Sequence, residues 1–459
     1  MSVYGFPFGP TYDEMARPEL IEPSVRATAI EALQNDELNP VNLFNITWKD
    51  RDNQVRKMVF PREITGLDVN IVVLLGNGFP SGSHKVGPAY STLIEACVDG
   101  VLDPEKHTIL GPSTGNFGIG VSYVCRLMGY RAVVIMPDNM SKERYDRIRK
   151  YGAALDLTPG TESDVILTLE RTHELMKDPA NFALAQFELL PNYRFHRHVT
   201  GSAAVEAALG VGNGRVACFV SAPGSAGTLA AGDHIKSVYP EAKIAAVEPY
   251  ECSTLSTGGR GQHRIEGIGD KMCTLIHNVL TTDFIITVHD DECVQALKVM
   301  REGAHILERL GVKREAADSM RDLFGVSGMC NVIAAVRMAR YLRLGPDENV
   351  VTVATDGFDR YESVIDDLDR RYLETTDHVL ERWACDIFAA QDDAAIHDVR
   401  RAEAKEKLYA QKERDWTPFG YSVEYLDSMK SQDFWEDEYA KYAYYNEKIG
   451  QMRGASGWR

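Results

Sequence analysis

The chain has 459 residues, too many for one small hydrophobic core, so we expect about two or three domains. Its hydrophobic share of 44% and charged share of 25% are ordinary for a globular protein. The net charge of −17, without a basic stripe, excludes nucleic acid as the expected partner. No apolar run is long enough to span a membrane, so no membrane association is expected.

The cysteines and the N-terminal residues indicate the compartment. The eight cysteines show no CxxC or metal-ligand spacing, which favours mostly buried thiols and no metal site. The first residues are not basic and no apolar run follows them, so a signal peptide is not expected. The sequence therefore predicts a reduced, cytoplasmic protein.

Residues 1–78 are predicted to form an N-terminal arm. A helix is expected at 24–33 and a short strand at 42–48, and both are expected to pack on the core or on a second subunit. An apolar run at 69–75 ends this region and is typical of a buried strand.

A lysine follows this strand, inside a run of small residues. Ser83, His84 and Lys85 precede a helical pattern that begins at residue 90. A lysine at such a junction can act as an amine nucleophile that forms a Schiff base, if burial lowers its pKa. A lysine in a turn rich in glycine and serine is also often a solvated loop residue, and this residue alone does not decide between the two interpretations.

Strands and helices then alternate, which predicts mostly parallel sheets. A strand at 107–110 runs into a glycine-rich loop at 111–120 and a helix to 128, and a second strand covers 131–136. Ser141 is expected to cap the next helix, which ends at Gly152. The loop stands at the carboxyl end of a strand, where α/β sheets bind ligands.

The second half repeats this pattern. A strand at 216–221 opens into a small-residue turn and a helix at 229–238, whose backbone N–H groups would form an anion cradle. A strand at 243–248, helices at 292–310 and 328–344, and a strand at 349–354 follow. Charged and aromatic residues mix in 371–459, which we interpret as a helical extension that wraps the core or a partner subunit, rather than a partly ordered appendage.

Several motifs together resemble one known family. In chain order they are Ser83-His84-Lys85, the loop 113–118, the stretch 131–153, Gln186-Phe187 with Asn192 and Thr200-Gly201, the turn 224–228, and Glu266-Gly267-Ile268-Gly269. With these motifs in this order, the chain resembles the pyridoxal-phosphate enzymes of the tryptophan synthase β fold. Within that fold it is most similar to the cysteine synthase and cystathionine β-synthase branch. The resemblance covers roughly residues 70–365.

The resemblance implies an α/β fold with two domains of open parallel sheets. The small, mobile domain would be 79–189 and the large cofactor domain 190–370, between the N-terminal arm and the helical C-terminal extension 371–459. Pyridoxal 5'-phosphate would lie in the cleft between the domains. Relatives are usually dimers, so a homodimer is expected.

The resemblance also implies roles for particular residues. Lys85 would hold the cofactor as a Schiff base and later act as the base at Cα, and Asn116 would hydrogen-bond the ring oxygen. The substrate α-carboxylate would be held by neutral donors, which suit a loop that closes and opens each turnover: Ser113, Thr114, Asn116 and Gln186. The phosphate would be held by Gly224, Ser225, Ala226, Gly227 and Thr228, with His84 touching it.

Each of these residues has a plainer interpretation when taken alone. Asn116 can simply cap the helix that follows it. Gln186 can be a satisfied core residue, the turn 224–228 can bind no ligand, and His84 can be a packed turn histidine. The ordered set of motifs favours the site. The stretch before Gly325 is longer than in cysteine synthases, with Leu310 to Asp322 as extra residues, and Phe117 replaces the usual threonine of the substrate loop. These differences leave the identity of the substrate undecided.

The partner of the pyridine nitrogen has two competing alignments. Aligning Arg360-Tyr361 with the cysteine synthase Arg-Tyr puts Gly357 where a hydroxyl is expected, whereas the tryptophan synthase pattern puts Thr355 there. We prefer Thr355, because a hydroxyl at a strand end leaves the nitrogen unprotonated and favours chemistry at Cβ. Asp356 is the rival, and successive strand residues should not both reach the ring.

The activity that the resemblance implies is pyridoxal-phosphate-dependent β-replacement on a serine- or cysteine-type amino acid, through an aminoacrylate. The first alternative is a β-eliminating lyase that releases pyruvate with ammonia or sulfide. The second is an inactive cofactor-binding scaffold, against which the intact Lys85, Asn116 and Gln186 argue.

Overall fold

Parallel sheets with covering helices form the protein. The computed structural model describes residues 8–372 and 375–455, so parts of the predicted arm and extension lie outside the described residues. The larger sheet has seven strands in the order β1-β2-β10-β7-β8-β9-β11. Their bounds are β1 (Lys57–Val59), β2 (Asn70–Leu75), β7 (Val216–Ser221), β8 (Lys243–Pro249), β9 (Phe284–Val288), β10 (Asn349–Ala354) and β11 (Ile396–Asp398). Only the edge strands β1 and β11 pair antiparallel.

The larger sheet is buried on both faces. Ile71 and Val73 of β2 join the core beneath α11 (Asp290–Glu302) and α14 (Val326–Tyr341). Their neighbours Val72 and Leu74 join the opposite core with α9 (Gly201–Ala208) and α10 (Ala230–Val238). Alternate side chains of a strand point to opposite faces, so a continuous apolar run satisfies both cores.

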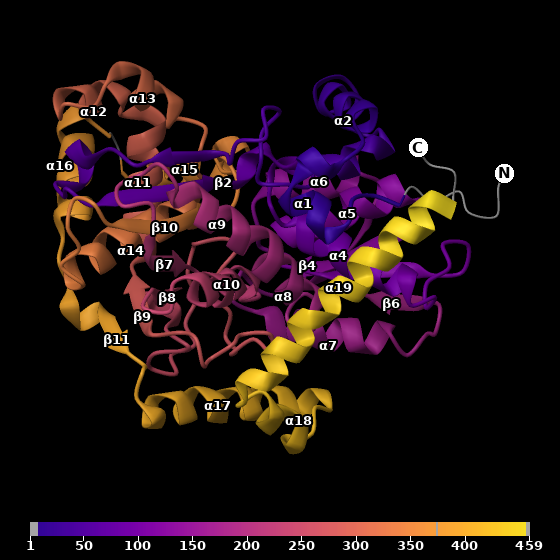
Figure 1. The fold of residues 1–459 in the computed structure, drawn as a ribbon. Helices are drawn as coiled ribbons and strands as arrows, with labels where there is room; N and C mark the ends of the chain where they lie inside the picture. Colours follow the sequence, from indigo (N-terminus) through magenta and orange to yellow (C-terminus); the bar gives the residue numbers. More distant parts are fainter. Residues whose placement is uncertain (1–7, 373–374, 456–459) are drawn as a thin grey trace.

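The smaller sheet has four parallel strands in the order β5-β4-β3-β6. Their bounds are β3 (Thr108–Pro112), β4 (Arg131–Pro137), β5 (Ala154–Thr158) and β6 (Asn181–Ala183), and the helices beside them are α4 (Val86–Val98), α5 (Asn116–Met128), α6 (Lys142–Lys150) and α7 (Val165–Leu175). Figure 1 shows this half beside the larger sheet. The predicted α/β fold of open parallel sheets is confirmed.

The remaining helices lie in three regions. The N-terminal region has α1 (Tyr12–Ala16), α2 (Pro23–Asn35) and α3 (Arg62–Thr65), and the large half adds α8 (Pro191–Phe195), α12 (Ala304–Arg309), α13 (Arg314–Ser319) and α15 (Glu362–Arg371). The extension has α16 (Asp377–Ala389), α17 (Ala402–Trp416), α18 (Val423–Ser428) and α19 (Gln432–Ala455). In Figure 1, α19 crosses the molecule toward the smaller sheet. Its Glu438 pairs with Arg194 of α8 over 3.1 Å, and its Asn446 donates to Asp13 of α1 over 3.1 Å, so it ties the N-terminal region to the core.

Three local predictions were wrong. Residues 42–48 form no strand, because Pro40 starts a 3-10 helix, η2 (Pro40–Asn45), whose preceding Asn39 accepts from the Val41 N–H. The helix predicted at 292–310 is broken at Gly303 into α11 and α12. Ser141 precedes α6, but its hydroxyl donates to Glu266 over 3.0 Å instead of capping the helix.

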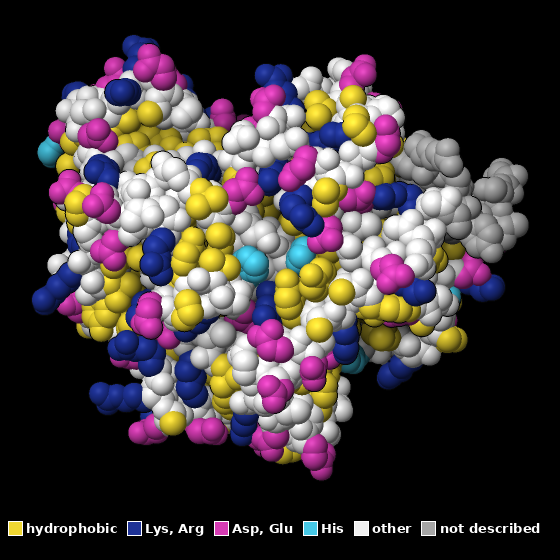
Figure 2. Space-filling model, in the orientation of Figure 1, with side chains coloured by type: hydrophobic (Ala, Val, Ile, Leu, Met, Phe, Trp, Pro, Cys, Tyr) yellow, Lys and Arg dark blue, Asp and Glu magenta, His cyan; other side chains and the backbone are white. Residues whose placement is uncertain are grey.

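The domain boundaries stay a prediction. The larger sheet takes β1 and β2 from the predicted arm and β11 from the predicted extension, so the chain crosses these boundaries in forming one sheet. Within the described residues, no helix is both long enough and apolar enough to cross a bilayer. Acidic and basic side chains are interspersed on the face shown in Figure 2.

Candidate active site

Lys85 stands at the start of α4, between the two sheets. The loop before it is tied to the end of β10, because the Ser83 hydroxyl donates to the Thr355 carbonyl over 3.1 Å. The Lys85 amine reaches the side-chain oxygen of Gln186 and the hydroxyl of Ser225, each over 3.3 Å. Burial lowers the pKa of Lys85 to about 8, although Asp270 and Glu162 oppose this shift. The neutral amine, which is the nucleophilic form, is therefore more populated near neutral pH than in a lysine of ordinary pKa.

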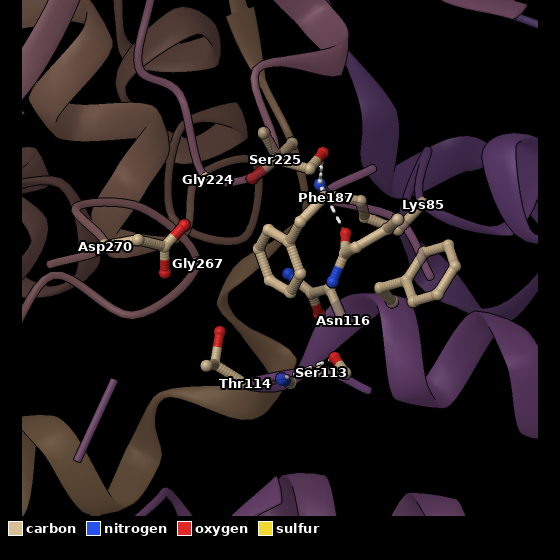
Figure 3. A pocket seen from close by; sticks show the side chains of 13 residues that line it. Lys85, Ser113, Thr114, Asn116, Phe187, Gly224, Ser225, Gly267 and Asp270 are labelled. Carbon is tan, nitrogen blue, oxygen red and sulfur yellow. Dashed lines mark hydrogen bonds between the residues drawn. The ribbon is translucent and has the colours of Figure 1, made fainter. Parts of the chain in front are cut away.

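The amine faces a pocket with about 370 Å³ of empty volume. Figure 3 shows that its lining comes from segments far apart in the sequence. The lining residues are Lys85, Ser113, Thr114, Gly115, Asn116, Phe117, Gln186, Phe187, Gly224, Ser225, Gly267, Asp270 and Thr355. The structure thus brings most of the predicted site residues into one pocket. The predicted site residues outside this lining are His84, Ala226, Gly227 and Thr228.

The loop before α5 presents small polar groups. The Ser113 hydroxyl accepts from the N–H groups of Gly115 and Gly118, over 2.9 and 2.8 Å. Asn116, the first residue of α5, donates its amide to Asp356 over 2.6 Å and accepts from Arg360 over 2.6 Å. Its side chain therefore does not cap the helix but joins the loop to the end of β10.

A tight turn follows β7, and two of its positions have no room for a larger side chain. A Cβ on Gly224 would lie 2.6 Å from the Gly267 carbonyl, and a Cβ on Gly227 would lie 2.2 Å from the side-chain oxygen of Asn192. Ala226 between them has a φ of 65°, so the turn is held in an uncommon conformation. The N–H groups of such a turn, before the helix that continues into α10, can cradle an anion.

Unpaired polar atoms lie beside this turn. The Thr200 hydroxyl accepts from Trp48 and lies 2.8 Å from His196 Nδ1. His196 Nε2 and Asn192 Oδ1 are buried without a hydrogen-bond partner, next to the position where a Gly227 Cβ would stand. Such atoms indicate that a polar group absent from the protein itself belongs here.

His84 packs behind the site. Its ring stacks on Trp48, with 5.7 Å between the centroids, and meets His196 edge-on. Its Nδ1 lies 3.2 Å from the Thr355 carbonyl, which fixes the proton on that nitrogen. Burial lowers the pKa of His84 to about 3, so the ring is neutral. The structure therefore favours a packed histidine, whose Nε2 has no protein partner.

Thr355 and Asp356 face different surroundings. Thr355 lines the pocket, and its hydroxyl lies 2.9 Å from that of Ser327. Asp356 is fully buried and accepts from Asn116 and from Tyr361, the latter over 2.8 Å. Both residues follow Ala354, the last residue of β10, and their side chains make contacts in different places.

A buried ionic network holds the loop before α5 in place. Arg144 of α6 is fully buried and pairs with Glu266 over 2.9 Å and with Glu162 over 3.7 Å. It also donates to the Tyr361 hydroxyl over 3.0 Å, and Glu162 accepts from Thr114. Burial opposes the charge of Arg144, but the surrounding carboxylates hold its pKa above the ordinary value. This network fixes Thr114 relative to the end of β10.

The sequence analysis missed Asp270 and Phe187 as lining residues. Phe187 belongs to the Gln186-Phe187 motif, but the sequence assigned no role to its side chain. Asp270 directly follows the Glu266–Gly269 motif, and an acidic residue at the end of a glycine turn was the available signal. Burial raises the pKa of Asp270 to about 7, although Lys85 opposes this shift. Among the described residues, no group of three or more metal-ligating side chains is arranged to hold a metal.

Comparisons with known proteins agree with this geometry. A family model described as pyridoxal-phosphate dependent enzyme matches residues 60–356. The cysteine synthase of Staphylococcus aureus is 32% identical over 285 residues, covering 62% of this chain and 84% of that protein. The probable cysteine synthase of Bacillus subtilis is 32% identical over 286 residues, covering 62% and 85%. A solved hydrogen sulfide-producing enzyme from Fusobacterium nucleatum matches with a TM-score of 0.58 and 25% identity, covering 66% of this chain and 95% of that one.

The fold and the pocket therefore define an enzyme that uses pyridoxal phosphate. The chain belongs to the pyridoxal-phosphate-dependent enzyme family, in the branch that includes the cysteine synthases. The residues present fit that cofactor. A lysine amine of lowered pKa could react with its aldehyde, and the constricted turn with its unpaired buried atoms could hold its phosphate.

Proposed function

We propose that the protein catalyses β-replacement on a serine- or cysteine-type amino acid, as a cysteine synthase does. The observation that carries the proposal is the convergence on one pocket of Lys85, the polar loop before α5, and the constricted turn after β7. The family supports the cofactor, and the curated relatives support the reaction type.

In this proposal the cofactor supplies an electron sink for the bond broken at Cα. Lys85 holds the cofactor and moves the Cα proton through Nζ. Ser113, Thr114 and Gln186 bind the substrate carboxylate through neutral donors. Asn116 has two amide hydrogens, and the one that does not meet Asp356 is available for the ring oxygen.

The turn after β7 orients the phosphate, and Thr355 faces the ring nitrogen. The turn residues in this role are Gly224, Ser225, Ala226, Gly227 and Thr228. Thr228 can contribute both its N–H and its hydroxyl, because the hydroxyl accepts from Ser221 over 2.7 Å and keeps its own proton to donate. A neutral hydroxyl at the ring nitrogen favours reactions at Cβ over transamination.

The test uses the purified holoprotein with serine, O-acetylserine and cysteine. We expect the cofactor absorbance to change with at least one of them, and added sulfide or another thiol to yield the β-substituted amino acid. A cofactor absorbance that responds to none of the three would contradict the proposal and favour the inactive scaffold. Mass spectrometry of the products identifies the nucleophile that is accepted.

A second candidate is β-elimination, with release of pyruvate and ammonia or sulfide. A structural neighbour described as a hydrogen sulfide-producing enzyme favours it. The same assay separates the two, because elimination yields pyruvate without an added nucleophile. Pyruvate formation that is faster than replacement at saturating thiol would favour the lyase.

We also propose that the protein works in the cytoplasm as a homodimer. All eight cysteines are free thiols, as a reducing compartment favours. Seven of them, all except the exposed Cys385, are partly or fully buried. Size-exclusion chromatography with light scattering tests the dimer, since a monomeric mass at micromolar concentration would contradict it.

A further inference from the structure

Among the described residues, one carboxylate in the pocket has no hydrogen-bond partner for a buried oxygen. Asp270 lines the pocket, is 6% exposed, and its Oδ2 is buried without a hydrogen bond. In Figure 3 it lies on the side of the pocket opposite Lys85. A buried carboxylate left unpaired is costly, so its retention at a ligand pocket indicates a function.

The other acidic groups near the pocket each accept hydrogen bonds and do not line it, although one oxygen of Glu162 and one of Asp356 have no hydrogen-bond partner. Glu162 accepts from Thr114 and lies beside Arg144, and Glu266 accepts from Ser141 and pairs with Arg144. Asp356 accepts from Asn116 and Tyr361. Asp270 is therefore the carboxylate in the described pocket whose oxygen is available to a substrate.

Asp270 also borders a second cavity. This cavity has about 290 Å³ of empty volume and shares Gly224 and Asp270 with the first. Its other lining residues are Pro223, Glu248, Thr254, Leu255, Gly269, Met272, Thr274 and His277. The Asp270 side chain therefore lines both cavities.

We propose that Asp270 is the catalytic acid–base group for the substituent on Cβ, while Lys85 serves Cα. This inference rests on the proposed function. In elimination, Lys85 Nζ takes the Cα proton, and the electron pair of that bond forms the second Cα–Cβ bond. The Cβ–X pair departs with X, and Asp270 gives its proton to X. In replacement, a nucleophile gives its proton to Asp270 while its lone pair bonds to Cβ, and the displaced pair returns to Cα with a proton from Lys85.

The charges around Asp270 suit this division of roles. Lys85, Glu162 and the Cys252 thiol are the titratable groups that interact with it electrostatically, and Glu248 and His277 line the adjoining cavity. Burial raises the pKa of Asp270 to about 7, so both of its protonation states are accessible near neutral pH. The carboxylate can therefore donate and accept in the same cycle.

The test compares leaving groups in the Asp270→Asn holoenzyme. Serine must lose hydroxide, which needs a proton, whereas O-acetylserine loses acetate, which does not. We expect pyruvate formation from serine to fall roughly 10²-fold or more, while that from O-acetylserine changes less than about threefold. The absorbance change of the cofactor on adding each amino acid measures binding apart from turnover, and it should persist.

The pH profile gives an independent readout. In the wild type, the ratio of serine to O-acetylserine turnover should fall as the pH rises through about 7, because protonated Asp270 is lost, and the ratio in Asp270→Asn should stay flat. Using the ratio removes the titration of Lys85 and Glu162, which affects both substrates. Asp164→Asn is the control, because Asp164 pairs with Lys271, next to Asp270, outside the pocket lining.

Equal losses on both substrates in Asp270→Asn would overturn the inference, as would no loss on either. A wild-type protein that reacts with O-acetylserine but with neither serine nor cysteine would also overturn it, while leaving the proposed function intact. If Asp270→Asn does not fold, Asp270→Ala with added formate repeats the test, and we expect formate to restore serine turnover selectively. A wild-type protein that reacts with none of the three amino acids would contradict the proposed function itself, which distinguishes that outcome from a failure of the Asp270 inference.

Discussion

The Lys85 amine donates to the side-chain oxygen of Gln186 over 3.3 Å, and this contact joins the start of α4 to the segment after β6. Gln186 is nearly fully buried, and its amide nitrogen lies 3.4 Å from the Pro112 carbonyl. The residue proposed to hold the cofactor is thus in contact with a residue proposed to bind the substrate.

Lys85→Ala should abolish the cofactor absorbance and the turnover while the fold survives. Lys85 faces a pocket rather than the core, so its truncation leaves no large cavity. Borohydride reduction of the wild type, followed by peptide mass spectrometry, should place the cofactor on Lys85. Turnover with a normal cofactor spectrum in the variant would remove Lys85 from the mechanism.

Cofactor capture should depend on pH through the Lys85 amine. Burial lowers the pKa of Lys85 to about 8, so the neutral amine becomes dominant as the pH rises through that value. The rate at which cofactor-free protein gains absorbance with pyridoxal phosphate should rise about tenfold from pH 7 to pH 9 and then level off. An amine of ordinary pKa would give a rate that keeps rising beyond pH 9, which is the contrary result.

Gln186→Ala should weaken amino-acid binding by about 1–3 kcal/mol, the cost of an unpaired polar partner. Spectral titration with the substrate found in the first assay measures this affinity. Cofactor content should stay near that of the wild type, because Lys85 keeps its contact with Ser225. Loss of the cofactor instead of the substrate would identify Gln186 as a structural residue.

Thr355→Ala should raise the dissociation constant of the cofactor about threefold to tenfold, from the loss of one hydrogen bond. Equilibrium dialysis of the reconstituted protein measures this constant. Ser327→Ala is the matched control, since it removes the hydroxyl that contacts Thr355 without lining the pocket. If Asp356→Asn changes the rate of transamination and Thr355→Ala does not, the ring nitrogen meets the carboxylate.

The sequence predicted what local patterns and ordered motifs determine. The strands at 216–221 and 349–354 have the predicted bounds, because continuous apolar runs between turns form buried parallel strands. The placement of Lys85, Gln186 and Ser225 in one pocket agrees with the motif order, although their roles remain predictions.

Other features depend on contacts that no local pattern encodes. The position of Asp270 in the pocket depends on the tertiary fold, which places its unpaired carboxylate opposite Lys85. Ser141 has the sequence of a helix cap, yet Glu266, more than a hundred residues further on, takes its hydroxyl. The strand predicted at 42–48 failed for a local reason, because Pro40 and Asn39 fix a helical turn there.

The C-terminal extension holds the segment after Asp270. Trp416 of α17 is fully buried and donates its indole N–H to the Cys273 carbonyl over 2.7 Å. Asp415 accepts from the Cys273 N–H over 2.9 Å, and Lys412 donates to the Leu275 and His277 carbonyls over 2.9 and 2.6 Å. These contacts satisfy the backbone of residues 273–277 from outside, since that segment forms neither a helix nor a strand.

Trp416→Ala should therefore destabilise the protein by about 3–5 kcal/mol, the usual cost of removing a buried tryptophan. Thermal unfolding followed by circular dichroism should show a lower midpoint. Hydrogen exchange should accelerate at the amides of residues 273–277 more than in β3, because the loss is local to that segment. Tyr444→Ala, at a side chain of α19 that is 51% exposed, is the control and should change neither measurement. If the midpoint falls but exchange at 273–277 stays as slow as in the wild type, α17 stabilises the protein without holding the segment beside Asp270.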